Sequence, residues 1–110
     1  MTLKQAIQKF DDEYKNTLPE TLKIEWINLL DSTVYNDIIL THQNKNNVTF
    51  SGYSTTTPHQ TVLLIPDPFS DVYIRFLAMK TELYYSDISK FNNSVILYNS
   101  AYTKFQHYYH

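Results

Sequence analysis

Residues 88–110, ISKFNNSVILYNSAYTKFQHYYH, carry the strongest periodic pattern in the chain. Apolar and aromatic side chains recur there at alternating steps of three and four residues: Ile88, Phe91, Val95, Tyr98, Tyr102, Phe105 and Tyr109. Steps of this kind place side chains on one face of an α-helix. Because neither proline nor glycine occurs between Phe69 and His110, nothing in the sequence interrupts such a helix.

A second helix is predicted just before it. Asp67 suits an N-cap and Pro68 a first helical position, where the N–H that proline lacks would be unpaired in any case. Two adjacent apolar stripes follow, one of Val72, Phe76, Met79 and Leu83 and another of Tyr73, Leu77 and Tyr84. Ser86 and Asp87 fit a turn and a fresh cap, so we expect two helices here rather than one.

The N-terminal half predicts two more helices. Thr2 and Gln5 have the spacing of a capping box, and Leu3, Ile7, Phe10 and Tyr14 follow at helical steps. Thr17 and Glu20 have the same capping spacing, with Pro19 in the first turn. The helix expected from about residue 18 to about residue 41 directs these side chains inward: Leu22, Trp26, Ile27, Leu30, Val34 and Ile38.

Residues 42–65 are expected to form a long polar loop between the two helical halves. This stretch contains the one glycine of the chain and ends at TVLLI, residues 61–65. Alternation around Val48 and Phe50 is compatible with a small two-stranded ribbon that joins 48–53 to 61–65. The sequence thus predicts a single, mainly α domain over residues 1–110, a small bundle of about four helices.

Composition excludes several classes of function. The absence of cysteine removes disulfides, thiolate metal sites and cysteine nucleophiles, and the lone glycine argues against a phosphate-binding loop. His107 and His110 are three residues apart without an evident third metal ligand. A net charge of −2 gives no basic surface for nucleic acid, and no apolar run is long enough for a membrane span. We therefore expect no enzyme activity, no cofactor, no metal and no membrane association.

The aromatic side chains suggest a partner surface. Tyrosine and phenylalanine at a helical seam suit a wet or partner-facing contact better than a dry core, in which leucine is the usual residue. A plain core stripe explains Tyr98 and Tyr102 equally well, but it explains the final turn poorly. Two sets of side chains are therefore predicted to contact partners: Tyr102, Phe105, Tyr108 and Tyr109 in the last helix, and Phe50 and Tyr53 in the loop.

Residues 23–42 and 63–110, together with the polar loop between them, resemble the head–tail connector, or adaptor, proteins of tailed bacteriophages and prophages of Gram-positive bacteria. The spacing of Trp26 and Asp31 carries the resemblance, as do the Leu64-Ile65-Pro66-x-Pro68 entry with Asp71 and Tyr73, and the run from Asn92-Asn93 to Phe105. These features are patterns of residue type and spacing, and none of them is a catalytic signature.

The resemblance implies a helical subunit of the phage neck, repeated as a homo-oligomeric ring of about a dozen copies beneath the portal protein. Its further partner would be a stopper or a tail-terminator protein. Double-stranded DNA would pass through the ring without sequence-specific binding, and no cofactor or reaction belongs to this role. The protein would be found in the virion neck, and in the host cytoplasm during assembly.

A second hypothesis from another class remains open. The same aromatic surface would serve a freestanding helical protein-interaction or regulatory phage protein that never enters the virion. A third and weaker alternative, a small enzyme of unfamiliar type, requires a buried pair of carboxylates or histidines with shifted pKa values.

Overall fold

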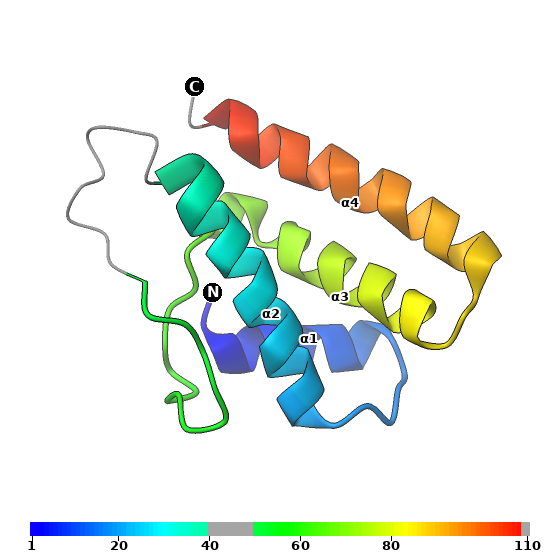
Figure 1. The fold of residues 1–110 in the computed structure, drawn as a ribbon, viewed down its shortest axis with the longest axis horizontal. Helices are drawn as coiled ribbons and strands as arrows, with labels where there is room; N and C mark the ends of the chain where they lie inside the picture. Colours follow the sequence, from blue (N-terminus) through cyan, green and yellow to red (C-terminus); the bar gives the residue numbers. More distant parts are fainter. Residues whose placement is uncertain (40–49, 109–110) are drawn as a thin grey trace.

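Four α-helices dominate the computed structural model, which describes residues 1–39 and 50–108 (Figure 1). They are α1 (Leu3–Glu13), α2 (Glu20–Val34), α3 (Asp71–Tyr84) and α4 (Ile88–Tyr108). A π-helical turn, η1 (Tyr35–Ile39), continues α2, and a short 3-10 turn, η3 (Asp67–Phe69), precedes α3. These two ranges contain no strand. The prediction of a mainly α fold of about four helices is confirmed.

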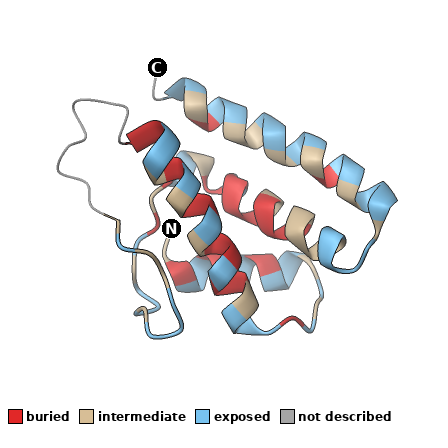
Figure 2. Ribbon diagram, viewed as in Figure 1, coloured by how far each residue is buried: buried red, intermediate tan, exposed pale blue. Residues whose placement is uncertain are grey.

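Helix α3 is the centre of the molecule. It contacts α1, α2 and α4, whereas α4 packs chiefly against α3 and η3 and forms one long edge of the fold (Figure 1). The buried positions in Figure 2 lie mainly on α1, α2 and α3, where these helices face one another. The core therefore lies on the α1–α2 side of α3, and α4 covers the opposite side.

The inward stripes follow the predicted periodicity in most positions. In α2 and η1 the expected side chains are buried, except for Leu22, which is half-buried. In α3 the stripes hold over the first three turns, but Leu83 and Tyr84 in the last turn are exposed. Asp71 and Arg75, four residues apart, form an ion pair on the surface of α3, with Arg75 Nε donating to Asp71 Oδ2 (3.1 Å).

The helix starts bear out the capping predictions in part. The Thr2–Gln5 capping box is present, since each side chain accepts the other residue's backbone N–H. The box predicted at Thr17 is wrong: Pro19 in extended conformation is the N-cap of α2, and no side chain caps it. The helix therefore begins at Glu20, about two residues later than expected.

In the C-terminal half, the start of α3 differs from the prediction and the start of α4 agrees with it. Asp67 is not the N-cap of α3, because Pro68 is taken up in η3 and Ser70 becomes the N-cap. The predicted break between the last two helices is confirmed. Ser86 has a φ of 59°, and Asp87 Oδ1 accepts the Lys90 N–H (3.2 Å) at the start of α4.

The predicted β-ribbon is absent from the described residues of the loop; positions 48 and 49 lie outside them. Residues 61–63 pair instead with the start of the chain, where the Leu3 N–H donates to the Thr61 carbonyl (2.9 Å) and the Leu63 N–H to the Met1 carbonyl (2.9 Å). On the other side, the Tyr53 N–H donates to the side chain of Asn28 in α2, so this N–H is not available for pairing between strands.

Candidate functional site

The inward face of α4 is an aromatic seam that attaches this helix to α3. The Tyr98 ring lies against Phe76 with centroids 5.3 Å apart, and it also contacts Tyr102 (5.7 Å). Farther along, Phe105 packs against Phe69 of η3 (5.9 Å). Much of the aromatic content at this end of the chain therefore holds α4 in place.

The four partner candidates at the end of the chain occupy different environments. Phe105 is fully buried, so the expectation that its ring is part of the surface is wrong. Tyr102 is half-buried, whereas Tyr108 has 63% of its surface exposed and rests on Phe69 (5.0 Å). Tyr109 lies outside the described residues. Tyr108 is thus the candidate that presents a large aromatic surface to solvent.

The Tyr102 hydroxyl group is an unusual feature of the seam. It is enclosed, and within the described part of the chain it has no hydrogen-bond partner. Burial raises the pKa of this phenol, and the charges of Asp37 and Asp31 add to the rise. The hydroxyl therefore lies on the side of α4 that approaches η1 and the end of α2.

Phe50 and Tyr53, predicted as exposed loop aromatics, are half-buried and contact each other edge to face (5.1 Å). Phe50 also lies against Tyr35 of η1 (5.9 Å). The Tyr53 N–H donates to Asn28 Oδ1 (2.8 Å). These contacts anchor residues 50–53 to the end of α2, so both rings have a structural role whether or not a partner touches their outer edges.

A buried carboxylate organises this anchor. Asp31 Oδ1 accepts the Tyr73 hydroxyl (2.7 Å), while Oδ2 accepts the Tyr53 hydroxyl (2.7 Å) and the Leu64 N–H (3.1 Å). The Tyr73 oxygen in turn accepts the Ile65 N–H (2.8 Å). This Asp31 cluster connects α2, α3 and two separate stretches of the loop, and each Asp31 oxygen has a donor.

Burial is the main electrostatic influence on the cluster. It raises the pKa of Asp31 above its ordinary value, while the donors Tyr53, Tyr73 and Leu64 oppose the rise. The same burial, with the nearby carboxylate, raises the pKa of both phenols. Because Asp31 is fully buried and its two oxygens accept hydrogen bonds from α3 and from the loop, the cluster holds these elements to α2.

This cluster was not predicted from the sequence, although a signal was present. Asp31 is four residues after Ile27 and three before Val34, so it shares their inward stripe. An acid on a buried stripe requires donors from elsewhere in the fold. The sequence does not say which residues supply them.

The outer face of α4 is depleted in charge. Residues 91–103 contain no aspartate, glutamate, lysine or arginine, and Lys90 and Lys104 stand at the two ends of this uncharged stretch. Ile96 has 67% of its surface exposed and Leu97 39%, with exposed asparagine, serine and threonine side chains around them. Depletion of charge around exposed apolar side chains is typical of the centre of a protein interface.

A second apolar surface occurs at the turn between α3 and α4. Four large side chains are about half exposed there: Leu83, Tyr84, Tyr85 and Ile88. The Tyr84 ring also contacts Trp26 of α2, with the ring centroids 6.3 Å apart.

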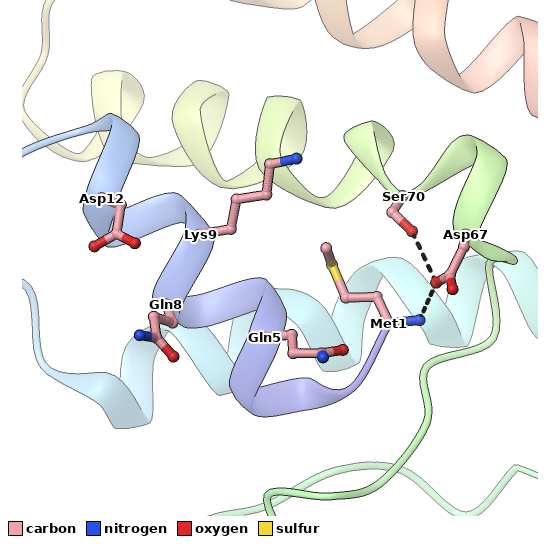
Figure 3. A pocket seen from close by; sticks show the side chains of 7 residues that line it. All are labelled: Met1, Gln5, Gln8, Lys9, Asp12, Asp67 and Ser70. Carbon is pink, nitrogen blue, oxygen red and sulfur yellow. Dashed lines mark hydrogen bonds and ion pairs between the residues drawn. The ribbon is translucent and has the colours of Figure 1, made fainter.

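Several hollows lie on the described surface. One, of about 490 Å³, lies along α1 beside Asp67, and Figure 3 shows its polar side chains spread out rather than converging. The dashed lines mark contacts of Asp67 with the Met1 amino group and with the Ser70 hydroxyl. Its mixed charges, Lys9, Asp12 and Asp67, do not assemble around one point, so this hollow has no recognisable chemistry.

A second hollow, of about 300 Å³, lies between α3 and α4 and is called the α3–α4 groove here. Its apolar part consists of Phe69, Val72, Leu97 and Ala101, and its polar part includes Asp71, Arg75 and Lys104. The groove joins the uncharged face of α4 to a mostly basic rim.

Within residues 1–39 and 50–108, histidine and acidic side chains form no group of three that would hold a metal ion. No helix in the same ranges combines the length and apolar character of a membrane-spanning segment. Comparison of the chain with protein-family models, with curated proteins and with solved structures finds no match.

Proposed function

We propose that the chain is a structural subunit of the phage neck, a head–tail connector or adaptor that forms a ring under the portal protein. In this role the ring attaches the tail, through a stopper or tail-terminator protein, and lets double-stranded DNA pass. The proposal assigns no reaction and no cofactor to the chain.

The uncharged outer face of α4 is the observation that supports this proposal best. A helix that is exposed on one side in a monomer usually carries charged residues there, as α1 does with Lys9, Asp12 and Glu13. On α4 the exposed positions between Lys90 and Lys104 are apolar or neutral. Such a surface suits burial against other protein chains, which the subunit of a ring requires on both of its sides.

The charge of the chain agrees with passage of DNA. A net charge of −2 provides no excess of lysine and arginine that would hold phosphates and slow the genome in a channel. Contacts with the portal and with the next neck protein are assigned to the exposed ring of Tyr108, together with Tyr109 beyond the described residues.

Quantitative mass spectrometry of purified particles tests the proposal. Particles from an induced source strain are expected to contain this protein at a ratio near one copy per portal subunit. Absence of the protein from particles that carry portal and tail would contradict the proposal and favour the freestanding interaction protein. A protein of the same strain that acts only inside the cell serves as the control for contamination.

A variant pair tests the assigned contact. Tyr108→Ala combined with Tyr109→Ala should reduce the yield of full, tailed particles, while Thr55→Ala, an exposed change in the loop, should leave it unchanged. Wild-type yield from the tyrosine variant would show that these rings are not an assembly contact.

A further inference from the structure

The α3–α4 groove has a defined chemical character. Leu97 and Ala101 contribute apolar surface from α4, and Lys104 follows Ala101 by one helical turn. Arg75 on the α3 side is paired with Asp71 (3.1 Å), whereas Lys104 forms no ion pair within the described residues. The groove therefore offers an apolar recess with one unpaired cation beside it.

The outer face of α2 has the complementary character. Leu29 has 50% of its surface exposed, and Glu25 lies one turn before it on the same face. The exposed charged residues of α2 and η1 are all acidic: Glu20, Glu25 and Asp37. Glu25 has no ion-pair partner among the described residues, unlike Glu20, which contacts His59 (2.8 Å).

The spacing of the two surfaces matches. Glu25 and Leu29 are four residues apart, about 6 Å along the α2 axis. Ala101 and Lys104 are three residues apart, about 5 Å along the α4 axis. A leucine side chain seated against Leu97 and Ala101 thus brings a glutamate one turn away within reach of Lys104.

A single copy does not bring these surfaces together. Arg75 at the groove also donates to the Tyr14 hydroxyl at the end of α1 (3.4 Å), so the groove opens beside α1. In Figure 1 α2 crosses in front of α1, and the residues that line the groove come from η3, α3 and α4 and not from α2. The complementary surface must come from a second molecule.

We propose that Leu29 of one copy inserts into the α3–α4 groove of a second copy, with Glu25 beside Lys104. The exposed turn at Leu83–Ile88 fits the groove less well, because charges of both signs surround it, Glu82 and Asp87 with Lys80 and Lys90. The contact joins two different surfaces of the same chain, so it is heterologous. Repetition of such a contact closes a ring when the rotation between copies allows it.

This inference rests on the proposed function, to which it adds the contact between neighbouring subunits. Cross-linking tests it directly, because the natural chain has no cysteine. Leu29→Cys and Ser100→Cys place single thiols on the outer face of α2 and at the groove, and both residues are exposed. The two purified variants are mixed at high protein concentration, oxidised and separated on a non-reducing gel.

The expected result is a mixed disulfide between the Leu29→Cys and Ser100→Cys copies, formed faster than the one between Thr55→Cys and Ser100→Cys. The double variant should give a series of longer oligomers. A mixed disulfide no faster than that control would overturn the proposal. Faster self-linking of Leu29→Cys would also overturn it, since a symmetric α2 pair would then be the contact.

Charge exchange gives an independent readout by sedimentation. Glu25→Lys and Lys104→Glu should each weaken self-association about fivefold, and a mixture of the two variants should recover it. Equal association of wild type, single variants and mixture would contradict the pairing.

Failure of this contact is distinguishable from failure of the proposed function. Absence of the cross-link, with the protein present in particles at the portal ratio, would remove the contact and keep the neck assignment. A specific cross-link in a protein that is absent from particles would keep the contact and remove the neck assignment.

Discussion

Removal of the Tyr73 hydroxyl group tests whether the Asp31 cluster holds the loop to the helices. Tyr73→Phe keeps the ring and its packing but deletes a group that donates to Asp31 and accepts from Ile65. Both neighbours are fully buried, so water does not readily replace the lost partner. Tyr53→Phe deletes a single hydrogen bond to the same carboxylate from a half-buried ring.

The expected loss for Tyr73→Phe is the sum of two effects. A hydrogen bond to a charged group contributes about 1.5–3 kcal/mol, and a buried N–H left without an acceptor costs about 1–3 kcal/mol. The free energy of unfolding should therefore fall by about 2.5–6 kcal/mol, a large part of the roughly 5–15 kcal/mol typical of a domain. Tyr53→Phe lacks the second effect, and because its ring is only half-buried, its loss should be smaller, about 1–2 kcal/mol.

Urea unfolding followed by far-ultraviolet circular dichroism measures these differences. Tyr85→Phe is the matched control, because its ring is 54% exposed and its change should stay within about 0.5 kcal/mol. A loss below about 1 kcal/mol for Tyr73→Phe, or one no larger than for Tyr53→Phe, would refute the reasoning. Such a result would mean that Asp31 and the Ile65 N–H are satisfied in another way.

Three other predictions concern stability. Burial raises the pKa of Asp31 above 3.8, so the stability that its protonation contributes is present below pH 3.8 and is lost as the pH rises through the folded-state pKa. The urea midpoint of wild type should therefore exceed that of Asp31→Asn by a margin that grows as the pH falls from about 7 to about 4. A difference that grows with pH instead would reverse the sign of the shift. Phe105→Ala should cost about 3–5 kcal/mol in urea unfolding, whereas Ile96→Ala on the outer face of the same helix should cost under about 0.5 kcal/mol; equal losses would contradict the burial assigned to them. Gly52→Ala should destabilise the protein by about 1–2 kcal/mol, because φ is 92° and the new Cβ would lie 3.1 Å from Asn28 Oδ1. The thermal unfolding midpoint should fall accordingly, and an unchanged midpoint would show that the turn relaxes freely.

Most of the helical fold was predictable because its determinants are local. The steps of three and four residues identify the helices, and the Thr2 box and the Asp87 cap depend on partners three residues away. The errors at Thr17 and Asp67 share a cause, since a nearby proline moved the start of each helix. The loop was less predictable because its hydrogen bonds go to helices far along the chain. Asp31 finds its donors 22, 33 and 42 residues away.

The candidate surface was predictable only as a helix face. Periodicity assigns Phe105 and Tyr102 to one seam, but it does not distinguish a seam covered by the same chain from one covered by a partner. At Phe105 the seam is covered by the same chain, because Phe69 of η3 packs against this ring. The uncharged exposed positions around Ile96 were visible in the sequence, yet their significance depended on knowing which face of α4 points outward.

Few residues of α4 are buried, so the positions that folding requires and the positions available for binding a partner are largely different. Of its 21 residues, Ser94 and Phe105 are the buried ones, so folding restricts few of its positions. A library randomised at Asn92, Ile96 and Ser100 should retain the fold in most clones, whereas selection for binding would narrow the same positions sharply. The binding specificity of the outer face of α4 can therefore be changed by substitutions at its exposed positions without altering the fold that supports it.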